Sequence, residues 1–406
     1  MRQQFLRRMA LGVSLALAGM AAHANDADGV KIGVLTDMAG VTADATGRGS
    51  VEAARLAIEE LGGSVLGKPV SLVSGDHQHR PDIGSSMVRK WYDTDGVDVV
   101  VDVPNSSVAL AVQGIAREKK KLVLFSSPGT TALTQAQCSP YGVQWTYTTY
   151  ALSRGTATAV VKEGNKRWFI LASDYAFGKQ LAADTETVVK ANGGEVVGTV
   201  FHPLNASDFA SFLLQAQASQ ANVVGLASAG GDLVNLIKQA QEFGLTGGKQ
   251  RLLTFLTFIN DVQAMGLPVA QGLAFPTGFY WDADDDTRAW TRRWQQKMGV
   301  TRPPSIVQAL SYVATTHYLQ AAQAAGTFDG AAVNQKMREL PITTKLIKNA
   351  RIRPEDGRVI MDLYLVEVKK PAESKYPGDF YRILSTVPGD KVFVSLADSE
   401  CPLIKK

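Results

Sequence analysis

The sequence predicts an α/β protein with two similar doubly wound lobes, whose parallel sheets are joined by a hinge that the chain crosses several times. Two segments, 30–125 and 167–255, carry this prediction because each shows four strands alternating with three helices. The expected strands are continuous apolar runs and the expected helices are amphipathic, as a parallel sheet covered on both faces requires. A third observation is the run of helices and alternating strands beyond residue 285, which can complete both lobes.

Apolar runs and amphipathic periods give the expected bounds of each element. In the first segment, strands are expected at 30–35, 70–73, 97–101 and 122–125, with helices at 49–61, 81–92 and 108–118. In the second, strands are expected at 167–172, 195–200, 223–227 and 252–255, with helices at 178–191, 208–218 and 232–243. Later helices are expected at 285–298, 305–325 and 330–339, and later strands at 361–368 and 380–386.

The break between the two segments and the later return of the chain define the expected lobes. The first lobe would contain 25–146 and about 277–350, and the second 147–276 and about 351–406, unless the tail returns to the first lobe. Several crossings make a hinge rather than a loose linker, so closure of the lobes would enclose a ligand.

Residues 1–24 have the features of a cleaved signal peptide. A basic start with three arginines precedes an apolar stretch, and Ala22-His23-Ala24 has the A-x-A form that signal peptidase reads. We therefore expect cleavage after Ala24 and export to the periplasm, with the general secretory and twin-arginine routes both open. Loss of the three arginines lowers the formal charge from +4 to +1, which gives no electrostatic basis for binding nucleic acid.

Two hydroxyl-rich turns follow strands of the first lobe. Their members are Asn105, Ser106 and Ser107 after the third strand, and Ser127, Gly129, Thr130 and Thr131 after the fourth. In a parallel sheet both turns lie at the carboxyl edge, where open α/β sheets bind ligands, and each begins a helix with free backbone N–H groups. The two turns predict a seat for a small carboxylate, with ordinary helix capping as the alternative.

Motifs for nucleotide binding and for catalysis do not occur in the sequence. Neither G-x-G-x-x-G nor G-x-x-x-x-G-K-[ST] is present, and the glycines at 225 and 230 miss the spacing of the hydrolase elbow by one residue. His77 and His79 lie in a polar loop without a further ligand nearby, so we expect surface histidines rather than a metal site. A binding protein without catalytic residues, cofactor or metal is expected.

Cys138 and Cys401 are the two cysteines of the chain. An even number in an oxidising compartment favours a disulfide between them. Two free buried thiols are the alternative.

Four further segments carry a family resemblance. They are KIGVLTDMAG from residue 31, the motif G-x-x-x-x-x-AARLAIEELGG at 47–63 followed by LGKPV, DYAFGKQL at 174–181 and SDF at 207–209. In this order and spacing they resemble type 1 periplasmic binding proteins, and more narrowly the branched-chain amino acid receptors of ABC importers. The resemblance implies a monomeric receptor that binds a small solute between its lobes and delivers it to a membrane permease.

The resemblance also implies which residues touch the solute. In the first lobe, that family holds ligand oxygens with the two hydroxyl-rich turns. In the second lobe, it implies contacts from Tyr175 and Phe177, and from the turn that contains Ser228 and Ala229.

One departure from the family bears on the ligand. Amino acid binders generally place an acid after the fourth strand of the second lobe, where it pairs with the ligand ammonium. This chain has no acid at 254–259, and Asp261 comes late. Because a buried ammonium without a carboxylate partner is costly, a carboxylate with an apolar or aromatic body is expected instead.

Aromatic residues near the expected hinge and cleft suit such a body. They are Tyr147, Tyr150, Phe258, Tyr280 and Trp281, with Thr257 beside them in the acid-free turn. Packing within the hinge is the alternative role for these rings. A branched-chain amino acid ligand, or a ligand-sensing lobe of a signalling system, remains the alternative function.

Overall fold

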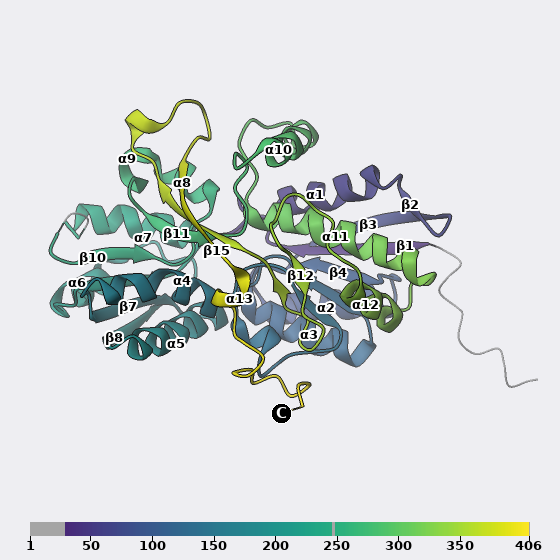
Figure 1. Cartoon of the computed structure of the whole chain (residues 1–406), viewed down its shortest axis with the longest axis horizontal. Coiled ribbons are helices and arrows are strands. Elements are labelled where there is room, and N and C mark those ends of the chain that lie inside the picture. Colours follow the sequence, from purple (N-terminus) through teal and green to yellow (C-terminus); the bar gives the residue numbers. More distant parts are fainter. Residues whose placement is uncertain (1–28, 246–247, 406) are drawn as a thin grey trace, which may run out of the picture.

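A six-stranded sheet forms the centre of the first lobe (Figure 1). The computed structural model describes residues 29–245 and 248–405, so the expected signal peptide lies outside the described residues. The sheet has the order β2-β3-β1-β4-β5-β6, and all neighbours are parallel except the β2-β3 hairpin. Its strands are β1 (Val30–Thr36), β2 (Ser64–Val65), β3 (Lys68–Asp76), β4 (Val99–Asp102), β5 (Leu122–Phe125) and β6 (Gly142–Gln144).

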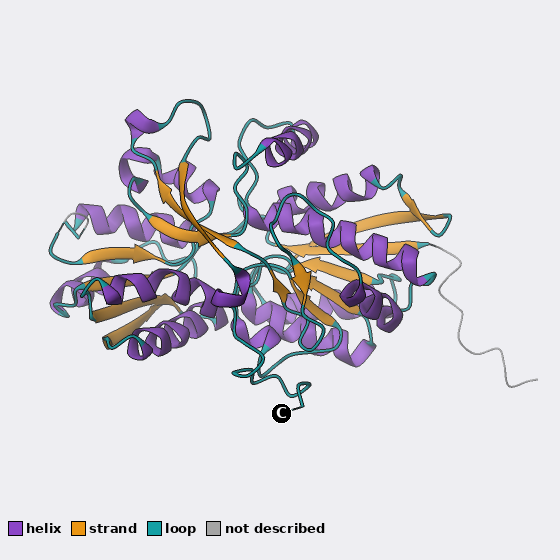
Figure 2. Cartoon of the chain, in the orientation of Figure 1, coloured by secondary structure: helices purple, strands orange, loops and turns teal. Residues whose placement is uncertain are grey.

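Helices cover both faces of this sheet (Figure 2). They are α1 (Gly47–Glu60), α2 (Pro81–Asp93), α3 (Ser106–Lys119), α10 (Asp285–Met298), α11 (Ile306–Ala325) and α12 (Gly330–Glu339). Val99 and Val101 of β4 point into the core on the α11 face, whereas Val100 between them joins the core formed with α2 and α3. This alternation explains why β4 is apolar from Val99 to Val101, as the sequence predicts for a strand buried on both sides.

The second lobe repeats the arrangement with a four-stranded parallel sheet of order β10-β9-β7-β8. Its strands are β7 (Arg167–Ser173), β8 (Glu195–His202), β9 (Val223–Ala227) and β10 (Arg251–Thr254). Its helices are α4 (Thr149–Lys162), α5 (Ala176–Ala191), α6 (Ala210–Ala218), α7 (Gly230–Glu242), α8 (Ile259–Met265) and α9 (Leu267–Ala270). The predicted α/β class with two doubly wound lobes is confirmed.

An antiparallel sheet of order β11-β14-β15 adds to the second lobe, where β11 lies beside β10 and α4. It consists of β11 (Ala274–Thr277), β14 (Leu363–Val368) and β15 (Tyr381–Val387), followed by α13 (Gly389–Val392). The structure also contains two short 3₁₀ turns, η1 (Thr131–Thr134) and η2 (Pro371–Glu373). The chain crosses between lobes after β6, after β11 and before β14, and its tail then returns to the first lobe.

The hairpin of β12 (Arg351–Ile352) and β13 (Val359–Ile360) lies on the first-lobe side of the hinge. The Gln144 N–H donates to the Gly357 carbonyl at 3.0 Å, which continues β6 into this hairpin. The boundary expected near residue 350 falls just before this hairpin. Strands of two residues carry no alternating pattern from which the hairpin could be predicted.

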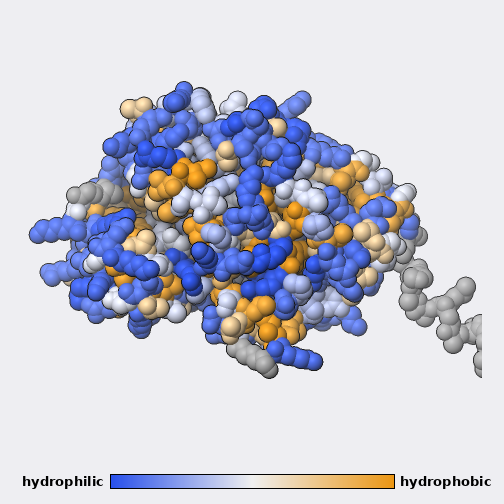
Figure 3. Space-filling model, viewed as in Figure 1, coloured by the Kyte–Doolittle hydropathy of each residue, from blue (hydrophilic) through white to orange (hydrophobic). Residues whose placement is uncertain are grey.

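On the face shown in Figure 3, apolar side chains lie at several separate places on the surface. Large exposed ones in the described part are Met38, Phe201, Leu214, Tyr376, Ile383, Leu384, Leu396 and Leu403. None of the helices in residues 29–245 and 248–405 combines the length and the apolar character that a membrane span needs.

Candidate functional site

A narrow pocket lies between the lobes, at the carboxyl ends of their strands. The first lobe and the adjoining hinge contribute Thr42, Thr46, Pro104, Ser127, Gly129 and Tyr147. The second lobe contributes Tyr175, Phe177, Ala229, Leu256 and Phe258. The wall is therefore hydroxyl-rich on one side and aromatic on the other.

A larger and more open hollow lies on the first lobe, between α1, α10 and α11. Ion pairs border it, including Arg293 with Glu60 and Lys345 with Asp286, and it lies away from the carboxyl edge of the sheet. The interlobe pocket is the better candidate, because it has the position at which open α/β sheets bind ligands.

Six of the residues expected to touch a ligand line the interlobe pocket: Ser127, Gly129, Tyr175, Phe177, Ala229 and Phe258. Thr257 and Tyr280 line a neighbouring hollow instead, which shares Phe258 with the pocket. The Tyr150 hydroxyl accepts a hydrogen bond from Arg154, and the Ser228 hydroxyl is bonded to His202. Tyr150, Ser228, Thr257 and Tyr280 are thus absent from the described pocket wall.

The turn before α3 uses its polar groups within the protein. The Asn105 side chain accepts from the N–H groups of Ser107 and Val108, which makes it the N-cap of α3. The Ser106 hydroxyl accepts from Thr130 N–H at 3.3 Å. The Ser107 hydroxyl accepts from Ala176 N–H of the second lobe at 3.2 Å. The Ser106 and Ser107 hydroxyls are acceptors in these bonds and keep their own protons, so the expected carboxylate seat stays a prediction.

The Ser127 hydroxyl donates to the carboxylate of Asp102, which lies at the end of β4. The same carboxylate accepts from Thr36 and Ser126 and is fully buried. Burial raises the pKa of Asp102 to about 6, although the three hydroxyl donors each lower it. Ser127 therefore presents oxygen lone pairs, rather than its proton, to the pocket.

Thr130 and Thr131 are also engaged. The Thr130 hydroxyl caps the turn η1 by accepting from Ala132 N–H. The Thr131 hydroxyl accepts from Tyr150 N–H and donates to Asp184 of α5 at 2.9 Å. The Thr131 side chain therefore ties the first lobe to the second next to the hinge.

The aromatic wall is formed by two ring pairs. Tyr175 and Phe177 have ring centroids 6.0 Å apart, and Tyr147 and Phe258 have centroids 6.5 Å apart. Burial raises the pKa values of Tyr147 and Tyr175 above their ordinary range. Both phenols are therefore neutral hydrogen-bond donors at physiological pH, and their rings offer apolar faces to a ligand.

The polar loop between β1 and α1 supplies pocket residues that the sequence reasoning missed. Thr42 and Thr46 of this loop reach the wall, as do Pro104 and Leu256 from other turns. The sequence does contain a pattern that could have identified this loop. The segment DMAGVTADATG follows a buried strand, as the two hydroxyl-rich turns do. Applying the strand-end argument to β1 would have included this loop.

The expectation of surface histidines at 77 and 79 is wrong. His77 is fully buried, and the His79 side chain is only 6% exposed and lies 2.7 Å from the Asp37 carboxylate. Burial lowers the pKa of His77 to about 4, which keeps that ring neutral. Within the described residues, no cluster of three or more His, Cys, Asp or Glu side chains could hold a metal ion.

Asp261, the first acid after β10, does not line the pocket. Its carboxylate accepts from Phe258 N–H at 2.8 Å as part of the capping box of α8. Burial raises the pKa of Asp261 to about 7, and the N–H groups of Phe258 and Gly230 lower it. The side chain fixes the turn that carries Phe258, so it is already bonded within the second lobe.

Known proteins match the chain over nearly all of its described length. The family model for periplasmic binding proteins matches residues 29–375, whereas no curated protein matches the sequence. A periplasmic binding protein from Burkholderia mallei has 48% identity and a TM-score of 0.90, over 93% of this chain and 100% of that chain.

Two further solved structures resemble the chain. A branched chain amino acid ABC transporter periplasmic ligand-binding protein from Burkholderia xenovorans LB400 has 38% identity and a TM-score of 0.81, over 93% of this chain and 100% of that chain. An ABC transporter solute binding protein from R. palustris, in complex with benzoate, has 20% identity and a TM-score of 0.78, over 92% of this chain and 99% of that chain. The last similarity shows the fold alone.

Proposed function

The chain belongs to the periplasmic binding protein family, and we propose that it captures a small apolar or aromatic organic acid for an ABC importer. Proteins of this family are periplasmic receptors that deliver small solutes to membrane permeases, and they are not enzymes. We further propose that the protein is a monomer, because residues of both lobes of one chain line the pocket and no second chain is needed to complete it. Light scattering that gives a dimer mass would contradict this last point.

The absence of a pocket carboxylate carries the proposal for the ligand. No acidic side chain is among the described residues of the pocket wall. Asp37, Asp102 and Asp261 instead accept hydrogen bonds from protein groups, including those of the wall residues Thr42, Ser127 and Phe258 respectively. A ligand ammonium would have to be buried without a direct ionic partner, which typically costs several kcal/mol.

The aromatic side of the pocket supports an organic acid. Phe177, Leu256 and Phe258 offer apolar contact area, and the phenols of Tyr147 and Tyr175 offer neutral donors to a carboxylate. These contacts come from both lobes, so a solute held between them would touch apolar and donor groups at once.

A matched pair of solutes tests the proposal. The pair is 4-methyl-2-oxopentanoate and L-leucine, which share a carbon skeleton and differ in having an oxo group or an ammonium at C2. Benzoate and cinnamate extend the panel to aromatic acids. A ligand at 100 times its Kd adds about 2.7 kcal/mol of stability, so thermal shift resolves binding readily. We expect the 2-oxo acid or the aromatic acids to raise Tm more than leucine does.

A branched-chain amino acid is the second candidate. The relative with 38% identity is described as a branched chain amino acid binding protein. The Ser127 oxygen, polarised by Asp102 behind it, could accept a hydrogen bond from an ammonium. A larger Tm increase with leucine than with its 2-oxo analogue would establish this candidate and overturn the first.

A further inference from the structure

Two helices of the second lobe begin at the cleft without a capping side chain of their own. The N-cap of α7 is Ala229, whose side chain has no acceptor, and the N-cap of α5 is Tyr175, whose side chain makes no capping bond. Both residues also line the pocket. Because the first N–H groups of a helix have no partner within the helix, these two helix starts require acceptors from elsewhere.

The first lobe supplies one acceptor to each helix, in addition to the Asp261 carboxylate of the second lobe, which interacts with Gly230 N–H at the start of α7. The Val41 carbonyl accepts from Gly231 N–H of α7 at 2.8 Å, and the Ser107 hydroxyl accepts from Ala176 N–H of α5 at 3.2 Å. These bonds join backbone and side-chain groups of the protein directly across the cleft. They form only when the lobes are closed, because in each bond the donor and the acceptor belong to different lobes.

Side chains of the first lobe hold Val41 in position. The Asp37 carboxylate accepts from Gly40 N–H at 2.6 Å and from Thr42 N–H at 2.9 Å, on either side of Val41. His79 fixes Asp37 from behind at 2.7 Å, and the His79 ring is in turn bonded to Asn105.

The far end of the same loop is also fixed. The Ser305 hydroxyl donates to the Ala45 carbonyl, and the Gln308 side chain donates to the carbonyls of Asp44 and Thr46. The carbonyl of Val41 is therefore presented to the cleft by a loop that is anchored at both ends.

From this arrangement we propose that the loop at 37–46 and Ser107 act as a closure latch. They cap helices α7 and α5 across the cleft and so maintain a closed population before any solute binds. The same contacts hold the lobes together around a bound solute and so slow its release. Asp37 and His79 are positioning residues in this device, since they act through the loop.

A substitution at Gly230 tests the contact between α7 and Val41 most directly. Its φ is +61°, and a Cβ built on it would lie 2.2 Å from the Val41 carbonyl oxygen, so Gly230→Ala prevents the α7 contact. The matched control is Gly193→Ala in the same lobe, where φ is +81° and a Cβ would meet nothing within 4 Å. Both variants carry the strain of a left-handed alanine, but only the first blocks the latch. Ser107→Ala and Ser107→Thr form a second pair that removes or keeps the hydroxyl.

Distances between spin labels on introduced cysteines measure closure directly. Exposed Thr94 of the first lobe and exposed Ser211 of the second are suitable positions, because the native cysteines are paired with each other. The protein is unfolded and refolded to remove solute, with its disulfide intact, and measured without any added ligand. Because no solute is present, these distances test the latch independently of the thermal-shift comparison that tests the proposed ligand.

We expect two distance populations in the unmodified protein. Gly230→Ala and Ser107→Ala should each lower the shorter one about five- to tenfold, the effect of losing one helix cap. Gly193→Ala and Ser107→Thr should retain it. The proposal is overturned if the unmodified protein shows no short-distance population, or if Gly230→Ala leaves that population unchanged.

Discussion

The Ser127 hydroxyl donates a hydrogen bond to the buried carboxylate of Asp102, which lies behind the pocket wall. The sequence predicts that Ser127 binds the carboxylate of a ligand, but its hydroxyl proton is used in a hydrogen bond to a carboxylate of the protein itself. Only the oxygen lone pairs of Ser127 face the pocket, so hydrogen-bond donors to a solute must come from other residues of the wall. The phenols of Tyr147 and Tyr175 are such donors.

The first prediction concerns the pH dependence that Asp102 imposes. Burial raises its pKa from 3.8 to about 6, so between these values the unfolded chain is ionised while the folded carboxyl is still protonated. Stability should therefore fall as pH rises from about 4 to 6 and level off above, by about 3 kcal/mol at most for this group. Asp102→Asn should flatten that part of the profile, since an amide does not titrate.

Thermal unfolding of both proteins between pH 4 and 8 makes the comparison. Burial also raises the pKa values of Asp232 and Asp261, so the unmodified protein contains further contributions of the same sign. The difference between the two curves isolates Asp102. Parallel curves over the whole range would show that Asp102 is ionised in the fold.

The second prediction concerns pocket width at Gly129. A Cβ added there would lie 2.9 Å from a carbon of the Tyr147 ring and 3.0 Å from one of Phe177, which belongs to the other lobe. Gly129→Ala should therefore lower solute affinity by about 1 to 3 kcal/mol, the usual cost of overpacking. Calorimetry with the solute that gives the largest thermal shift measures the effect. Gly114→Ala in α3, where nothing lies within 4 Å, should leave affinity unchanged.

The fold was predictable where burial alone determines residue type. The strands β5 and β9 begin and end at the expected residues, because a strand covered on both faces must be apolar throughout and polar turns bound it. The β12-β13 hairpin was not predictable, since its position depends on pairing with β6 near Gln144, more than two hundred residues earlier in the chain.

The position of the interlobe pocket was predictable, but the bonding of its residues was not. Hydroxyl-rich turns after β4 and β5 indicated the edge of the sheet at which the pocket lies, and Ser127 and Gly129 lie in the pocket wall. Residue type shows that a hydroxyl can bond, but the partner of Ser107 is a backbone group of the other lobe. The Asp37 and His79 pair was missed for the same reason, because the two residues meet only once β1 and β3 lie side by side.

The third prediction concerns Arg358, which is buried at the hinge. Its guanidinium donates to the Thr146 carbonyl in the segment that first crosses between lobes, donates to the Val359 carbonyl, and lies 4.3 Å from the ring centroid of Phe393. Arg358→Met should lower the free energy of unfolding by about 2 to 4 kcal/mol, because two buried carbonyls lose their donor. Arg167→Met removes an exposed ion pair with Glu195 and should cost less than about 1 kcal/mol. Urea unfolding compares the two, and equal losses would show that Arg358 contributes no more than a surface charge.

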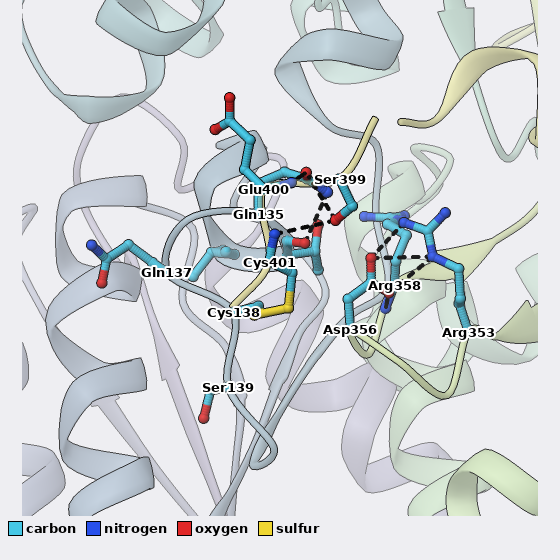
Figure 4. Close-up of a disulfide and its surroundings, with 12 residues drawn as sticks. Gln135, Gln137, Cys138, Ser139, Arg353, Asp356, Arg358, Ser399, Glu400 and Cys401 are labelled. Atoms are coloured by element: carbon cyan, nitrogen blue, oxygen red, sulfur yellow. Dashed lines mark hydrogen bonds and ion pairs between the residues drawn. A yellow bond between two sulfur atoms is a disulfide. The ribbon is translucent and has the colours of Figure 1, made fainter. Parts of the chain in front are cut away.

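The fourth prediction concerns the tail, which a disulfide fixes to the first lobe (Figure 4). Cys138 and Cys401 are joined with their Cα atoms 5.6 Å apart. Beside them the Gln135 side chain accepts from the Ser399 hydroxyl and from Glu400 N–H at 2.9 Å. The link closes a loop of 263 positions that contains the whole second lobe.

Because the loop is so long, the entropic model assigns the disulfide about 5 kcal/mol at most, and less if the unfolded chain is already compact. Replacing both cysteines by serine should therefore lower Tm, and a reductant should lower Tm of the unmodified protein but not of the double variant. Peptide mapping without reductant should recover one cross-linked pair, and two free thiols would contradict the link. If the double variant keeps its Tm while the cross-link is present in the unmodified chain, the hydrogen bonds to Gln135 suffice to anchor the tail, and the disulfide adds only protection of the exported protein against local opening.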